Sequence, residues 1–189
     1  MSECRIWEPS FDVLMEVLVS TTVLPALGEI EVFRSNARTT QRIVAMNVDG
    51  ITQKESLVQP QPAGNCLNWV LGHLIWVYGN VLPLVKQQSV VSEDNLKRYA
   101  RGAPPLKDAA EALDIAELMK LWNESADRFD AGLETLTSED LDAKTPISPR
   151  NDPNETVRSL LGLVTFHQAY HAGQLGLLRR IAGKPGAIA

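Results

Sequence analysis

Residues 159–178 read SLLGLVTFHQAYHAGQLGLL and contain no Asp, Glu, Lys or Arg. His167 and His171 lie four positions apart in this stretch, and residues four apart share one face of a helix. A second uncharged stretch, residues 56–85, contains His73, the third and last histidine of the chain. Both stretches carry asparagine or glutamine, which are costly in a bilayer, so we predict two buried helices rather than two membrane spans.

The composition is that of a single globular domain of 189 residues, with 44% hydrophobic and 22% charged residues. The net charge is -5 and the sequence pI is about 5.2. Without a basic stripe, this charge argues against a nucleic-acid partner. Cys4 and Cys66 cannot form a disulfide framework, and the N-terminus does not read as a signal peptide. We therefore expect a cytoplasmic protein with no membrane or nucleic-acid partner.

Apolar residues recurring at helical spacing predict an all-α domain. No segment alternates between apolar and polar residues as a strand with one face in water would. The clearest apolar stripe belongs to the third predicted helix, residues 114–136, whose carboxylates lie on the faces away from that stripe. The connection SEDNLKRYARGAPPLKDAAEA, residues 92–112, is long for a helical bundle and predicts a crossover or a lid. The predicted helices cover about 29–48, 65–85, 114–136 and 154–182.

Local signals set the expected helix ends. Asn65 is the predicted N-cap of the second helix, with Pro83 in its last turn. The fourth helix is expected to begin near Asn154 or Glu155 and to end before Gly183. The apolar stripes are Ile30, Phe33, Ala37, Val44 and Val48 in the first helix, and Ile115, Leu118, Met119, Trp122, Ala126, Phe129 and Leu133 in the third.

The three histidines form the candidate metal site. His167 and His171 can aim their imidazoles at one point and supply half of a tetrahedral site. This pair alone also fits two buried polar residues of a core. His73 changes the balance, because it lies on the other uncharged helix and no further histidine exists. Three imidazoles buried without partners would each cost a few kcal/mol, roughly, and one divalent ion satisfies all three. Three histidines with an open position are also a catalytic zinc arrangement.

The segments WVLGHLIW, residues 69–76, and HQAYHAGQLGLLRR, residues 167–180, resemble the DinB/YfiT-like superfamily of metal-dependent helical enzymes. The resemblance covers most of the chain. It implies a four-helix bundle with up-down-down-up connectivity over residues 29–183, between an N-terminal extension, residues 1–28, and a C-terminal tail, residues 184–189. It also implies that His73, His167 and His171 are the metal ligands.

The resemblance further implies one divalent transition-metal ion, for which we expect zinc in preference to nickel, and a homodimer. Some members of this superfamily are transferases or isomerases that use low-molecular-weight thiols such as bacillithiol or mycothiol. The expected function is therefore metal-dependent hydrolysis or thiol transfer on a small molecule. The alternatives are a noncatalytic metal-stabilised bundle with a binding or stress-response role, and a bundle without metal.

Several polar residues are candidates to assist the metal. Gln174 and Tyr170 flank the histidine face, and Gln41 lies near the inner face of the first helix; each could orient a ligand or contact substrate. For Gln174, a plain hydrogen bond within the bundle is an equal alternative. No acid is placed as a general base, so metal-bound water or thiolate is the expected nucleophile. Gln168 stands where the zinc-protease motif HExxH has its glutamate, which excludes that reading.

Two surfaces are candidates for the dimer contact. Small residues on the fourth helix fall opposite the histidines and would permit close approach of a second subunit: Gly162, Ala169, Ala172, Gly173 and Gly176. The other candidate is the predicted outer face of the second helix: Leu71, Ile75 and Tyr78. Cys66 and the tryptophans Trp69 and Trp76 are interpreted as core or pocket walls.

Overall fold

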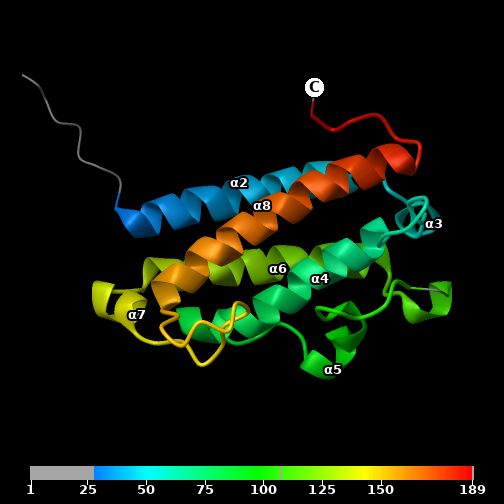
Figure 1. The fold of residues 1–189 in the computed structure, drawn as a ribbon. Coiled ribbons are helices and arrows are strands. Elements are labelled where there is room, and N and C mark those ends of the chain that lie inside the picture. The colour runs from blue at the N-terminus through cyan, green and yellow to red at the C-terminus, as the bar shows by residue number, and fades with distance from the viewer. Residues whose placement is uncertain (1–27, 107, 189) are drawn as a thin grey trace, which may run out of the picture.

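The computed structural model describes residues 28–106 and 108–188. Cys4 and all of the predicted N-terminal extension except Gly28 lie outside the described residues. Four long helices dominate the described chain (Figure 1): α2 (Glu29–Val48), α4 (Leu67–Val81), α6 (Ile115–Glu134) and α8 (Val157–Ile181). The shorter elements are α3 (Gln53–Ser56), α5 (Glu93–Leu96), α7 (Ser138–Asp142) and three 3-10 turns, η1 (Leu82–Val85), η2 (Lys97–Tyr99) and η3 (Ala109–Glu111).

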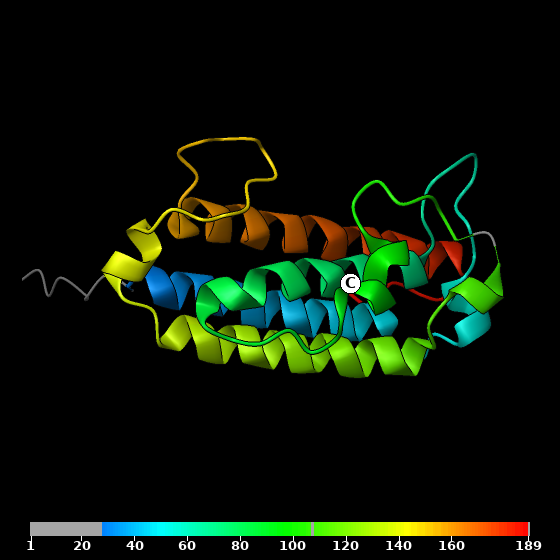
Figure 2. The same ribbon diagram turned by 90° about the horizontal axis from the view of Figure 1, so that it is seen from below.

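The long helices lie side by side, α2 and α8 running in one direction and α4 and α6 in the other (Figures 1 and 2). Contacts at both ends fix the direction of the first pair. Arg158 at the start of α8 forms an ion pair with Glu29 at the start of α2. Arg179 near the end of α8 donates to the backbone carbonyl of Asn47 near the end of α2, at 3.2 Å. Because α4 and α6 are parallel, the connection between them returns along the length of the helices, which is the crossover that its length predicted.

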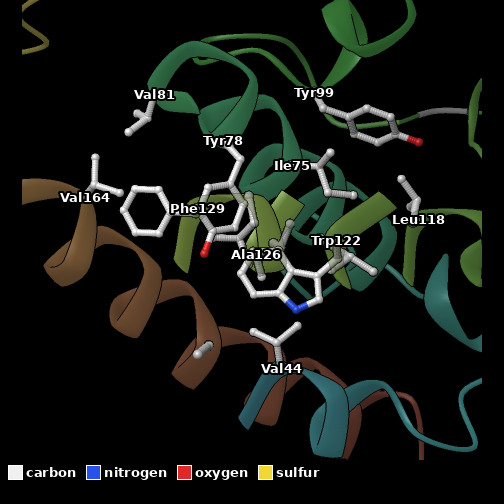
Figure 3. Close-up of a cluster of buried hydrophobic side chains, with 14 of the residues drawn as sticks. Val44, Ile75, Tyr78, Val81, Tyr99, Leu118, Trp122, Ala126, Phe129 and Val164 are labelled. Carbon is white, nitrogen blue, oxygen red and sulfur yellow. The ribbon is translucent and has the colours of Figure 1, made fainter. Parts of the chain in front are cut away.

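The core lies at the centre of the four long helices, between the pair α4 and α6 and the pair α2 and α8 (Figure 3). The ring of Tyr78 packs against those of Trp122 and Phe129, with centroids 5.1 and 5.2 Å away, and all three side chains are buried. Val44 of α2 closes the cluster from the opposite side. The stripe predicted for the third helix faces this core, with only Met119 partly exposed.

Two predicted helix starts were wrong by one or two residues. Cys66, not Asn65, is the N-cap of α4, and its carbonyl accepts the first helical bond from Val70 at 3.1 Å. The N-cap of α8 is Thr156, whose hydroxyl accepts from the Ser159 N–H in a capping box. Glu155 is not the cap. Its buried carboxylate accepts hydrogen bonds from Ser148 and Arg150 of the preceding loop and from the hydroxyl of Ser159.

The end of α4 also differs from the prediction. The α-helix stops at Val81, and Pro83 lies in the following 3-10 turn η1. Proline has no N–H for the α-helical ladder, so the chain tightens at this point instead of continuing to Val85 as an α-helix.

The predicted outer face of the second helix was wrong. Leu71, Ile75 and Tyr78 are at most 1% exposed. The reason is that α4 is covered on several sides, by α6, by α8 and by the returning crossover with α5 and η2. A helix surrounded in this way has no free apolar face for a second subunit.

The small residues of α8 do not form one outward face either. Ala172 is buried at 3% exposure, and Gly176 lies against the side chain of Asn47 in α2. Asn47 also donates to the Ala172 carbonyl at 3.0 Å. These two positions therefore pack against α2, while Gly162, Ala169 and Gly173 are exposed.

The described residues are helical apart from loops and an isolated bridge between Lys144 and Thr156, as the all-α prediction requires. Within the same residues, none of the helices combines the length and the apolar character that crossing a bilayer demands.

Candidate metal centre

The structure brings His73 of α4 together with His167 and His171 of α8. The two α8 histidines are one turn apart on the side that faces α4, and His73 projects toward them from the middle of its own helix. The Nε2 atom of His167 lies 3.3 Å from that of His73 and 3.1 Å from that of His171. One ring nitrogen from each histidine lies within 4.8 Å of the others, so the cluster can hold a single metal ion.

Hydrogen bonds behind two of the rings determine their tautomers. The Nδ1 atom of His73 is 2.8 Å from the backbone carbonyl of Tyr99, and the Nδ1 atom of His171 is 2.8 Å from Oε1 of Gln174. Both partners are acceptors, so each Nδ1 carries the proton and donates it. The Nε2 atoms of these two rings are therefore left with free lone pairs, as metal ligands require.

The Nε2 atom of His167 faces the Nε2 atoms of both other rings. The Nδ1 atom of His167 is buried and finds no hydrogen-bond partner among the described residues. If its Nε2 atom carries a proton, that proton can be donated to only one of the two facing lone pairs. One Nε2 lone pair is therefore left without a hydrogen bond. A cation placed among the three Nε2 atoms would bind all of their lone pairs, so the donor set fits a metal ion.

All three imidazoles are held neutral at pH 7. Burial lowers the pKa of His167 to about 4, with further contributions from the charges of His171 and His73. Burial is also the main cause of the lowered pKa of His73, where the bond to the Tyr99 carbonyl acts in the opposite direction. The pKa of His171 is lowered by burial against an opposing contribution from Gln174. Neutral imidazoles are the form that binds metals.

Aromatic rings fix the orientation of His73. Trp69 and Trp76 stack on it with ring centroids 5.0 and 5.7 Å away and nearly parallel planes. Trp69 is buried in the core and Trp76 lines the cleft described next, which agrees with their interpretation as core and pocket wall. The imidazole is thus held on its faces as well as at its Nδ1 atom.

A cleft of about 650 Å³ opens beside the histidines, between α4 and α8. His73 and His167 lie in its wall, and Ile147 to Arg150 of the loop before α8 close it on one side. Arg101 of the crossover also lines it and donates to the Pro149 carbonyl at 3.0 Å. Figure 2 shows the loop and the crossover projecting on the same side of the bundle. The cluster therefore has access to a space of the size that small-molecule sites occupy.

The other candidate residues divide into two groups. Gln174 bonds to His171, and Tyr170 lies beside the same ring, with centroids 5.1 Å away, although its side chain is 63% exposed. Gln41 is not at the site, since it donates instead to Asp127 of α6 at 3.0 Å. Cys66 is fully buried away from the cluster, and burial raises the pKa of its thiol.

Two residues of the crossover were missed by the sequence analysis. Tyr99 contributes a backbone carbonyl, which every residue has, so no side-chain pattern could reveal it. Its hydroxyl accepts from the Leu113 N–H and donates to Asn68, both at 2.9 Å, and these bonds hold the carbonyl against His73. Arg101 is one of several arginines in polar segments, and only the path of the crossover brings it to the cleft.

The structure is thus that of a helical protein with a cluster of three histidines that can hold a metal ion. Comparison with protein-family models gives its family: the model of the DinB superfamily matches residues 36–175. The chain belongs to this superfamily. A search of curated proteins found no match. Family and cluster together fit a metal-binding DinB-like protein.

Proposed function

We propose that this protein is a metal-dependent enzyme that transfers a low-molecular-weight thiol to a small molecule. In this proposal His73, His167 and His171 hold one divalent ion, zinc in preference to nickel. The convergence of three Nε2 atoms beside a cleft of about 650 Å³ carries the proposal. A bundle in which the metal served stability alone would have no need of such a cleft, whereas an enzyme or a binding protein would. Three imidazoles leave a coordination position open for a reacting ligand, which favours the enzyme.

A divalent ion held by three imidazoles would supply Lewis acidity, lowering the pKa of a thiol or water that shares the site. The residues of this chain supply the rest. Tyr99 and Gln174 fix the ligand tautomers, and Trp69 and Trp76 fix the plane of His73.

The absence of an acid from the cleft favours thiol transfer over hydrolysis. Among the described residues that line it, none is an aspartate or glutamate able to act as a general base. A thiol has a pKa of about 8.5, against about 15.7 for bulk water, so it needs far less help to lose its proton. Hydrolysis remains the second candidate reaction of the same site.

The metal assignment is tested on untagged protein purified without a nickel column. We expect about one equivalent of a transition metal per chain, removed by chelator. Restoring zinc at about 100 times its Kd should raise the free energy of unfolding by about 2.7 kcal/mol. The same addition should have no effect on the variant His73→Ala. Less than about 0.2 equivalents, with the same melting temperature before and after chelation, would contradict the assignment.

The reaction is tested by mixing the metal-loaded protein with low-molecular-weight thiols and a panel of electrophiles, with a parallel screen of esters and amides. We expect conjugation that requires both the thiol and the metal and that His171→Ala abolishes. Undiminished conjugation in that variant would overturn the mechanism. Ester or amide cleavage without thiol would select hydrolysis.

We further propose that the long helices form the up-down-down-up four-helix bundle of the DinB/YfiT-like type and that the protein acts in the cytoplasm as a homodimer. The exposed side of α8 supports the dimer. Phe166, Tyr170 and Leu177 are 68%, 63% and 59% exposed on one stripe of this helix. Large apolar side chains gathered on one helix face are typical of a contact with another protein.

A further inference from the structure

The cleft has an uneven distribution of polarity along its length. Its walls on α4 and α8 are mainly apolar, and its histidines lie toward one end. Val81 lies eight positions after His73 on the α4 wall, about 12 Å along the helix axis. Leu160 of α8 lines the cleft near the same far end, one turn after the start of that helix. Away from the histidines these two walls carry one polar lining residue, Asn80, whose amide donates to the Trp76 carbonyl of its own helix at 2.8 Å. The cleft between α4 and α8 is therefore a mainly apolar channel with the histidines at one end.

The two arginines that line this channel have different environments. Arg150 is neutralised by Glu155, with Nη2 2.5 Å from Oε1 and Nε 3.3 Å from Oε2. Glu155 is itself 2% exposed, so this ion pair belongs to the structure of the loop before α8. Arg150 has no charge left over for a ligand.

Within the described part of the chain, Arg101 has no such partner. Its bond from Nη1 to the Pro149 carbonyl uses one donor of the guanidinium, and no carboxylate among the described residues pairs with it. The Nε and Nη2 groups are left to bind an anion, and a planar carboxylate matches this fork with two parallel hydrogen bonds. Arg101 follows Tyr99 by two residues, and the Tyr99 carbonyl lies 2.8 Å from Nδ1 of His73, so Arg101 lines the cleft at its histidine end.

We propose that the cleft binds a small organic acid whose single carboxylate pairs with Arg101 and whose apolar body, aryl or branched alkyl, lies between α4 and α8. The proposal rests on the proposed function and specifies its substrate class. A single unpaired arginine matches one negative charge better than the several charges of a phosphate ester. Because Arg101 and the histidines share one end of the channel, the reacting carbon lies only a few atoms from the carboxylate.

Calorimetric titration of the full-length protein tests this inference with three probes: 4-phenylbutyrate, the uncharged 4-phenylbutanol and acetate. Chelator-treated protein is used first, so that metal coordination of the carboxylate plays no part. We expect phenylbutyrate to bind at least about tenfold more tightly than either other probe, because only it uses both Arg101 and the apolar wall.

Variants separate the two contributions. Arg101→Gln should weaken phenylbutyrate binding about tenfold and leave phenylbutanol unchanged. The matched control Arg42→Gln removes the same charge from an exposed position of α2 outside the cleft and should change neither. Leu163→Trp should fill the channel and weaken both phenyl probes. Equal affinities for acid and alcohol, an acid preference retained by Arg101→Gln, or no binding of any probe at millimolar concentration would each overturn the inference.

The same titrations on metal-loaded protein distinguish this inference from the proposed function. If the protein binds one equivalent of metal and catalyses thiol transfer but shows no preference for the acid, the inference fails and the proposed function stands. If the protein binds no metal yet keeps an Arg101-dependent preference, the inference stands and the proposed function fails.

Discussion

Gln174 and His171 show how one side chain prepares another for metal binding. The bond of 2.8 Å between Oε1 and Nδ1 holds the proton on Nδ1 and turns the Nε2 lone pair toward the other histidines. Both residues lie on α8, three positions apart, so the pair needs only helical geometry. The sequence therefore sufficed to nominate Gln174, and the structure shows its bond to a candidate ligand. That this bond orients the ligand stays a prediction.

Gln174→Leu tests this bond. The substitution keeps the side-chain bulk but removes the acceptor, so we expect metal affinity to fall about 10- to 100-fold, as is typical for loss of a partner behind a ligand. Competition with a chromophoric chelator measures the change. Gln41→Leu is the control, because Gln41 bonds to Asp127 away from the cluster. Equal metal affinities of both variants would show that the bond has no such role.

The buried imidazole of His167 leads to a prediction about acid stability of the metal-free protein. Burial lowers its pKa to about 4, below the value of about 6.5 in an unfolded chain. The unfolded state therefore takes up the proton first as the pH falls. The associated stability is complete above pH 6.5 and is lost between pH 6.5 and about 4.

Urea unfolding of the metal-free wild type and of His167→Gln at pH 7 and pH 4.5 checks this prediction. Other groups titrate in both proteins, so the difference between them isolates His167. The wild type should lose more stability on acidification, by on the order of 1–2 kcal/mol. Parallel losses in the two proteins would contradict the assigned direction of the pKa shift.

At the scale of elements, the contact of α4 with η2 connects the fold to the metal centre. Gly72 lies directly against the ring of buried Tyr99, and a Cβ atom at this position would overlap that ring. The ring that packs against Gly72, the hydroxyl that bonds to Asn68 and Leu113 and the carbonyl that bonds to His73 all belong to Tyr99. Close packing at Gly72 therefore helps to place the acceptor behind a candidate ligand.

Gly72→Ala should both destabilise the protein, by about 1–3 kcal/mol, and weaken metal binding, because displacement of Tyr99 moves its carbonyl away from His73. Gly132→Ala is the matched control. Its Cβ would overlap Val85 of η1, which has no contact with the cluster, so stability should fall while metal affinity is retained in the folded protein. Chemical unfolding and metal competition on both variants make the comparison. Unchanged metal affinity in Gly72→Ala would contradict the role of Tyr99.

For the whole molecule, burial restricts where a second subunit can bind. The outer face predicted for the second helix lies in the core, and Ala172 and Gly176 pack toward α2. The exposed stripe of α8 with Phe166, Tyr170 and Leu177, which the sequence did not single out, is the candidate contact that the structure supplies. The stripe neighbours the histidine face of the same helix, since Tyr170 touches the ring of His171.

Light scattering after size exclusion should give a dimer for the wild type at micromolar concentration. Phe166→Glu should shift it to a monomer, because burying the new carboxylate in an apolar contact is unfavourable. Val58→Glu, at another exposed apolar position outside the stripe, should leave the dimer intact. A monomeric wild type would refute the proposed dimer. A Phe166→Glu variant that remains dimeric would show that the exposed stripe of α8 is not the dimer contact.

The sequence by itself determined the elements and the candidate cluster. Helical periodicity located the long helices and the core stripe of α6, and the spacing of His167 and His171, with His73 on the other uncharged helix, identified the three rings that meet. These features are local, since spacing along one helix defines a face.

Only the tertiary structure decided what surrounds these elements. The path of the crossover places the Tyr99 carbonyl behind His73, brings Arg101 to the cleft and helps to bury the face of α4 that looked exposed. A helical pattern records that a face is apolar but not which segment covers it, and a backbone carbonyl leaves no mark in the sequence. Contacts between distant segments therefore settled the shape and charge of the cleft.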